Sequence, residues 1–460
     1  MKTGAAESRA ELRGGGSAGR ARFPAGQILM GAGLLAALLG APASSMVRAG
    51  AGGVYEALPL DDDNEERLLR NVNAYEDLFV RRGYRYETSE LDAFVGRVGA
   101  ALTPRSTDPY IKYRFRILRD PQANAFALPD GQVYVNTGML AGLENEAQLA
   151  ALLAHEIQHT AGHHGLLSYR SARRKIITSM VLGPLTLGVG DVFLALSVAG
   201  YSRELESEAD RLGLERMHAA GYDPRQMAAL FELFGGDPEG ESVQTSGSKW
   251  STHPETLARV ESARTQAARR LGGRPANLKV NAQGYRRLAR QAGLDTVQDM
   301  IAADYPRAAL GMARWLLSED ATDAGRHLAV ADSYLALGAR QAQVGDLSNK
   351  EKRANRWARY THTREEREER RLGTEEGRKA LRVNMDLARR SYLRALELNP
   401  NLPEARRGLG YALDGLDRPQ DAGVHFVAYL KARPGAADRE LVLDRMREIN
   451  GKIKRGGKVR

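Results

Sequence analysis

The chain has 460 residues, a length that predicts two domains rather than a single hydrophobic core. Hydrophobic residues make up 43% and charged residues 27%, which excludes a disordered chain and a polytopic membrane protein. Lys and Arg outnumber Asp and Glu by 67 to 57, and much of this surplus lies near the N-terminus and after residue 349. We therefore favour an export leader and solvated helix faces over a surface that binds anionic membranes or nucleic acid. Cysteine is absent, so a metal site would need His and carboxylate ligands.

The N-terminal segment has the organisation of a secretory signal peptide. Four arginines precede a short apolar run over 27–40, and the small-x-small site Ala41-Pro42-Ala43 follows it. We therefore predict a signal peptide over 1–43 and export across a membrane. The apolar run is too short to span a bilayer comfortably, and an uncleaved anchor is the alternative.

The next part of the chain predicts helices followed by a small sheet. Apolar residues at helical spacing over 61–102 indicate two amphipathic helices. Alternation of polar and apolar residues over 110–118 predicts a strand. An Asp-Gly pair at 130–131, between two short apolar runs, predicts a β-hairpin.

Three segments in the middle of the chain predict different kinds of structure. An Ala- and Leu-rich pattern over 145–161 predicts a helix. The apolar stretch over 176–199 is long enough to span a membrane, but Gly, Pro and Asp191 interrupt it. We favour a helical hairpin there, with a membrane span as the alternative. The Gly- and Ser-rich stretch over 235–252 predicts a loop.

The C-terminal part has a helical pattern with an internal repeat. The run from Tyr392 to Pro400 matches the run from Phe426 to Pro434 at a spacing of 34, the tetratricopeptide period. Residues 328–338 are similar to the first helix of an earlier unit. We predict a tetratricopeptide-like domain, and a generic helical bundle is the alternative.

The residues with the clearest chemistry form a His-Glu-x-x-His motif. His155 and His159 lie one helical turn apart, so both imidazoles can reach one ion from the same face. Glu156 is rotated by about 100° from His155, which places its carboxylate beside the water that a zinc ion would bind. Zinc lowers the pKa of that water, Glu156 accepts its proton, and a peptide carbonyl is then attacked. Two solvated helix histidines are the alternative interpretation.

A catalytic zinc needs a third protein ligand, and an acidic segment over 201–210 offers two candidate pairs. Glu206 and Asp210 share one helix face, so Glu206 can reach the ion while Asp210 orients a ligand imidazole. Glu204 and Glu208 have the same spacing, and spacing alone does not choose between the pairs. Without the two histidines, this segment would be interpreted as an acidic solvated helix.

Several motifs between residues 124 and 210 carry a family resemblance. They are Asn124-Ala125-Phe126-Ala127-Leu128-Pro129, Gly131-Gln132-Val133-Tyr134-Val135, the H-E-x-x-H helix, and Ser202-Arg203 leading into E-x-E-A-D. The region resembles the HtpX and CAAX-prenyl-protease family of gluzincin metalloendopeptidases. That resemblance implies one zinc ion per chain, Glu206 as its third ligand, and Asp210 behind the ligands. It also implies that the hairpin edge at Asn124, Ala125 and Phe126 receives an extended substrate.

Two histidines mark a departure from the family pattern. The family often has Arg before the His that stands five residues after the second ligand, whereas this chain has His163 before His164. We interpret both as residues at the end of the helix rather than as ligands.

A further motif narrows the resemblance to one group within the family. Ser251-Thr252-His253-Pro254, followed by Arg259, is similar to exported members with a C-terminal tetratricopeptide domain, the β-barrel assembly-enhancing proteases of the Gram-negative periplasm. This likeness implies a periplasmic location. It also makes His253 a candidate gate that can occupy the open zinc position. A helix-start residue before Pro254 is the alternative.

Together these observations predict an α+β fold in two parts. A mostly helical zincin-type protease domain with a small β-sheet is expected over 55–272, and an all-α tetratricopeptide-like domain over 285–460. The expected function is an exported zinc endopeptidase that degrades misfolded or stalled outer-membrane proteins. The repeats would bind clients or an assembly machine, and peripheral contact with a membrane is left open. A chaperone or adaptor with a latent zinc site, and an integral membrane metalloprotease, are the alternatives.

Overall fold

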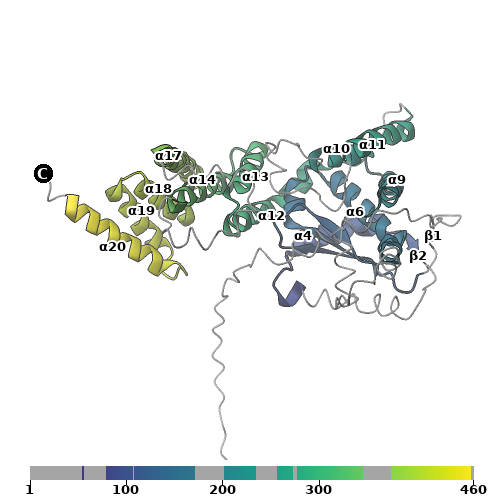
Figure 1. Ribbon diagram of the computed structural model, residues 1–460, viewed down its shortest axis with the longest axis horizontal. Helices are drawn as coiled ribbons and strands as arrows, with labels where there is room; N and C mark the ends of the chain where they lie inside the picture. Colours follow the sequence, from purple (N-terminus) through teal and green to yellow (C-terminus); the bar gives the residue numbers. More distant parts are fainter. Residues whose placement is uncertain are drawn as a thin grey trace, which may run out of the picture.

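The computed structural model describes residues 54–55, 79–106, 108–170, 201–234, 256–272, 277–344 and 375–456. A mostly helical N-terminal part surrounds a small sheet, and a row of helices extends from it to the C-terminus (Figure 1). The predicted fold class is therefore confirmed. The predicted signal peptide over 1–43 and the segments 176–199 and 235–252 lie outside the described residues. Within the described ranges, no helix combines the length and the apolar character needed to cross a membrane.

A three-stranded sheet with the order β3-β5-β4 lies next to the central helix α6 (Glu146–Ala161). The strands are β3 (Arg114–Leu118), β4 (Ala125–Ala127) and β5 (Gln132–Asn136); a separate parallel pair joins β1 (Val54–Tyr55) to β2 (Arg105–Ser106). β3 runs parallel to β5, and β4 pairs antiparallel with β5. The predicted hairpin is confirmed, and Gly131 takes a φ of +93° in its turn, where glycine is favoured.

The strand predicted over 110–118 is wrong at its start. β3 begins only at Arg114, because a turn precedes it in which the carboxylate of Asp108 accepts a hydrogen bond from the Tyr110 amide at 2.8 Å. This Asp-based turn holds the chain out of the extended conformation, which period-two alternation alone does not reveal.

The N-terminal core extends from Tyr86 to Ala292 and is built around α6. The other helices of this part are α4 (Ser89–Leu102), α5 (Thr137–Gly142), α9 (Arg203–Ala219), α10 (Arg225–Phe234) and α11 (Thr256–Leu271). Every residue of α6 is buried, as its Ala- and Leu-rich sequence allows, because α4, α9, α10 and the sheet pack around it. Its start is set by Asn145, whose side chain accepts a hydrogen bond from the Gln148 amide at 2.9 Å. The prediction of α6 is confirmed, as is that of α4, the second of the two helices predicted over 61–102; most of the first lies outside the described residues.

The long helix α12 (Ala282–Ala302) belongs to two cores at once. Its first half places Tyr285 in the N-terminal core. Its second half places Val297 in the C-terminal core, which runs from Val297 to Ile449 and includes Ala141. An ion pair between Arg119, next to β3, and Asp299 of α12 adds a second connection at 2.9 Å. α12 therefore joins the two parts of the molecule (Figure 1).

The helices after α12 pack in chain order, each against the next. They are α13 (Pro306–Glu319), α14 (Ala324–Val344), α17 (Glu375–Leu398), α18 (Pro403–Gly415), α19 (Pro419–Ala432) and α20 (Arg439–Gly456). Tyr392 and Phe426, the equivalent positions of the sequence repeat, are both fully buried. Their rings lie against Gly408 and Gly410 of α18, where a larger residue would collide with them. This burial is common to many helical hairpins, so the tetratricopeptide assignment stays a prediction.

Candidate metal centre

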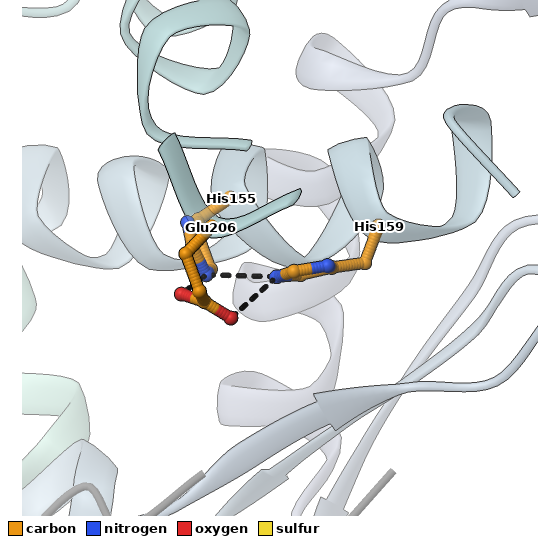
Figure 2. Close-up of side chains that lie close together, drawn as sticks. All are labelled: His155, His159 and Glu206. Atoms are coloured by element: carbon orange, nitrogen blue, oxygen red, sulfur yellow. Dashed lines mark hydrogen bonds and ion pairs between the residues drawn. The ribbon is translucent and has the colours of Figure 1, made fainter. Parts of the chain in front are cut away.

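Helices α6 and α9 bring the three predicted ligands together. Figure 2 shows the side chains of His155, His159 and Glu206 pointing toward one another. The two Nε2 atoms of the histidines are 3.0 Å apart. The carboxylate oxygens of Glu206 lie 3.5 Å from each of these nitrogens. All three residues are buried and form a group that could hold a metal ion.

The spacing of these atoms fits one tetrahedral zinc ion. Zinc–nitrogen and zinc–oxygen bonds of about 2.1 Å in tetrahedral geometry place neighbouring ligand atoms about 3.4 Å apart. The observed separations of 3.0 and 3.5 Å bracket that value. Two imidazoles and one carboxylate are also a ligand set of catalytic zinc sites, in which a fourth position stays free for the reaction.

The structure distinguishes between the two acidic pairs that spacing left open. Glu206 and Asp210 are buried beside the histidines, whereas in the other pair Glu204 is exposed to solvent and Glu208 faces His164. The difference arises because α9 turns one face toward α6, and residues at helical spacing on that face approach His155 and His159 directly.

A glycine allows α9 to approach α6 this closely. A Cβ atom built on Gly213 would lie 3.1 Å from the backbone nitrogen of His155, which is tighter than ordinary van der Waals contact. Gly213 is seven residues, or about two turns, beyond Glu206 and so lies on the same face of α9. The close contact at Gly213 therefore determines how near Glu206 lies to the histidines.

On one side of the site, Asp210 and Arg259 support His155. The Nδ1 atom of His155 lies 3.0 Å from a carboxylate oxygen of Asp210. Arg259 donates two hydrogen bonds to the same carboxylate, at 2.7 and 2.8 Å, and lies 3.4 Å from Glu206. Burial raises the pKa of Asp210, but the interactions with His155 and Arg259 lower it more strongly, to about 2. Asp210 is therefore a carboxylate at neutral pH and can accept the Nδ1 proton of His155, leaving Nε2 toward the ligand cluster.

On the other side, an aromatic ring and a histidine contact His159. The ring of Tyr201 stacks on the imidazole, with centroids 3.9 Å apart. The Nδ1 atom of His164 lies 2.9 Å from the Nδ1 atom of His159. We interpreted His163 and His164 from sequence as helix-end residues, and both do follow the end of α6. The contact with His159 was missed, although the family's histidine at this position was a signal for it.

The remaining predicted residues divide into those near the site and those outside the described chain. Glu156 lies within α6 and is only 1% exposed. Ala125 and Phe126 lie in β4, an edge strand of the described sheet, and Asn124 directly precedes it. The carbonyl of Asn124 accepts a hydrogen bond from the Asn136 amide on the β5 side at 3.0 Å. His253 lies outside the described residues.

Comparison with known proteins identifies peptidases as relatives of this chain. A family model described as peptidase family M48 matches residues 89–267. The chain is 30% identical over 237 residues to mitochondrial metalloendopeptidase OMA1 of Schizosaccharomyces pombe, which covers 45% of this chain and 67% of that relative. Identity to OMA1 of Arabidopsis thaliana is 32% over 151 residues, covering 31% of this chain and 30% of the relative. The β-barrel assembly-enhancing protease of Yersinia pestis is 27% identical over 198 residues, covering 38% and 39%.

The extent of these matches differs among the relatives. The chain spans two thirds of the fission-yeast relative but less than half the length of the plant and bacterial relatives. The family match includes α6, α9 and most of α11, and therefore every residue of the candidate metal centre. It ends before α12 and leaves the C-terminal helices without a match to the family model.

Proposed function

The chain belongs to peptidase family M48 and is a zinc metalloendopeptidase, and we propose that His155, His159 and Glu206 hold its catalytic zinc ion. The observation that carries the proposal is the convergence of three buried ligand atoms from α6 and α9, at separations that suit a tetrahedral ion. Asp210 orients His155, and Arg259 holds Asp210 in place.

Glu156 is the general base of the proposed reaction. When zinc is bound, it lowers the pKa of water and polarises the scissile carbonyl. Glu156 then accepts the proton of the attacking water and delivers it to the leaving amine. Its place next to His155 on α6 keeps it beside the ion without making it a ligand.

The proposed substrate is an extended segment of an unfolded or misassembled protein. β4 is an outer strand of the described sheet, and we propose that a substrate adds to it as a further strand. In this arrangement the main chain of Asn124, Ala125 and Phe126 positions the scissile bond. Such a site recognises the main chain of the substrate more than its side chains. This recognition suits an enzyme that acts on many unfolded clients.

We further propose that these clients are outer-membrane proteins in the periplasm. The proposal is supported by the similarity to β-barrel assembly-enhancing proteases and by the predicted signal peptide over 1–43. The C-terminal helices, proposed as a tetratricopeptide-like domain over 285–460, would bind clients or an assembly machine, because such arrays present long concave surfaces. The protease domain is proposed over 55–272.

The burial of the site favours a latent enzyme. His155, Glu156, His159 and Glu206 are each at most 3% exposed, and in this proposal a conformational change opens the site to a substrate. We propose His253 as the gate, on the grounds of the Ser-Thr-His-Pro motif.

The burial of the metal centre also supports a second candidate function, a chaperone or adaptor whose zinc site stays closed. His253→Ala should raise proteolysis if the site is gated, whereas continued inactivity with bound zinc would favour the chaperone.

The decisive test of the proposed chemistry is Glu156→Gln, made in both the wild-type and the His253→Ala background. Cleavage of casein should fall by about 10²–10⁴-fold, because the general base is lost. Zinc content should stay near that of the parent, because Glu156 is not a ligand. Glu204→Gln, an exposed change on α9, is the matched control and should cleave normally. Normal cleavage by Glu156→Gln would overturn the mechanism.

A further inference from the structure

His164 is a buried histidine that the proposed mechanism does not use. It lies beyond the end of α6 and is only 1% exposed. Its Nδ1 atom is 2.9 Å from Nδ1 of His159, the nitrogen that points away from the ligand cluster. The opposite nitrogen of His159, Nε2, is the one that faces Glu206.

The proposed binding of metal through Nε2 of His159 determines that the other ring nitrogen, Nδ1, carries the proton between the His159 and His164 rings. A histidine that binds a metal through Nε2 carries its proton on Nδ1 and donates it to a neighbouring group. The neighbouring atom here is Nδ1 of His164, which must then be the unprotonated, accepting nitrogen. The proton of a neutral His164 consequently lies on its Nε2 atom.

An acidic residue faces that second nitrogen. The Nε2 atom of His164 lies 3.8 Å from a carboxylate oxygen of Glu208, whose side chain is mostly buried. This separation is too long for a hydrogen bond, and His164 Nε2 has no hydrogen-bond partner among the described residues. The carboxylate charge of Glu208 still favours a proton on the nitrogen that faces it, which is the tautomer of His164 that can accept from His159.

The local backbone is built to place the His164 ring. His163 takes a φ of +52°, a left-handed conformation that turns the chain back at the end of α6. A Cβ atom on Gly162 would lie 2.4 Å from Nε2 of His164, so only glycine leaves room for the ring in this position. The rings of His164 and His159 then meet edge to face, with centroids 4.9 Å apart.

We propose that His164 is a positioning residue that holds the His159 imidazole in its ligating orientation, with Glu208 fixing the His164 tautomer. The two histidine ligands are thereby supported in different ways. Asp210 faces His155 directly, whereas the ring of His164 stands between His159 and Glu208. The inference rests on the proposed zinc site.

The test measures zinc affinity by competition with a chromophoric chelator. His164→Phe keeps an aromatic ring but removes the acceptor, and should weaken zinc binding by about 10–100-fold. His164→Asn places an amide oxygen near the position of Nδ1 and should restore most of the affinity. Glu208→Gln should give a smaller loss than His164→Phe. His327→Phe, a change on α14 far from the site, is the control and should bind zinc like the wild type.

A second readout separates positioning from general destabilisation. Cobalt(II) in place of zinc should give a visible spectrum that changes in His164→Phe at full loading and returns toward wild type in His164→Asn. Wild-type affinity and spectrum in His164→Phe would overturn the inference, as would equal losses in the Phe and Asn variants. If His164→Phe does not fold, His164→Asn and Glu208→Gln decide, and wild-type spectrum and affinity in Glu208→Gln would reject the role of that acid. A wild-type protein that binds no metal would instead refute the proposed function itself.

Discussion

At the scale of single residues, the buried pair of Asp210 and Arg259 makes the site more sensitive to the loss of one partner than an exposed ion pair would. The Arg259 guanidinium donates two hydrogen bonds to Asp210 and lies over the ring of Phe231 at 4.3 Å. Its planar fork matches the carboxylate, a geometry that lysine cannot reproduce. Removal of Arg259 would take two hydrogen bonds from the buried carboxylate of Asp210 and leave it beside the Nδ1 atom of His155.

We therefore expect Arg259→Ala to lower the free energy of unfolding by about 3–5 kcal/mol, and Arg259→Lys to lose part of that amount. Urea unfolding of the metal-free protein measures both. Arg264→Ala is the matched control on the same helix, because its ion pair with Glu232 is exposed and should contribute no more than about 1 kcal/mol. If Arg259→Ala and Arg264→Ala are equally stable, the buried pair of Asp210 and Arg259 contributes no more to stability than the exposed pair of Arg264 and Glu232.

Sequence alone predicted most of the ligand cluster at this scale but not its supporting contacts. His155, His159 and Glu156 follow from local helical spacing, and the choice of Glu206 over Glu204 needed either the family resemblance or the structure. The contact of His164 with His159 depends on the left-handed conformation of His163. Backbone conformation at a helix end of this kind has no periodic signal in the sequence.

At the scale of elements, the distance between α6 and α9 controls the position of Glu206. Gly213→Val should push α9 away, because even the first carbon of the new side chain meets the α6 backbone at 3.1 Å. We expect weaker zinc binding and a loss of about 1–3 kcal/mol in unfolding free energy. Gly423→Val on α19, where a Cβ atom meets nothing within 4 Å, is the control and should keep both properties. Unchanged zinc affinity in Gly213→Val would argue against a set distance between the helices.

Prediction of the elements succeeded where the signal was local. The β4–β5 hairpin follows from its Asp-Gly turn, and α6 from its continuous helical pattern. The parallel pairing of β3 with β5 could not be predicted, because strand order arises from contacts between distant segments. The dual role of α12 was also missed, since one amphipathic pattern does not show that its two halves pack into different cores.

At the scale of the whole molecule, α12 makes the two cores depend on each other. Tyr285 is fully buried in the N-terminal core, and its hydroxyl donates a hydrogen bond to the Leu140 carbonyl at 2.7 Å. Tyr285→Ala should lower the unfolding free energy by about 3–5 kcal/mol through the cavity it leaves.

The same substitution should loosen the joint between the two parts. We expect a larger radius of gyration in small-angle scattering, with the helical content of the C-terminal part retained. Tyr305→Ala, an exposed tyrosine just beyond α12, is the control and should change stability by no more than about 0.5 kcal/mol. An unchanged radius of gyration in Tyr285→Ala would show that other contacts hold the two parts together.

If three side chains from two helices hold one zinc ion, the amount of zinc bound per chain should depend on each of them. Zinc bound per chain should be measured by elemental analysis for the purified wild type, for Glu206→Gln, and for Glu204→Gln as the exposed control on the same helix. We predict about one zinc per chain in the wild type and in the control, and a clear loss in Glu206→Gln, whose neutral amide is a poor zinc ligand. A metal-free wild type, or a Glu206→Gln protein that retains its full zinc, would show that these three side chains do not hold the ion together.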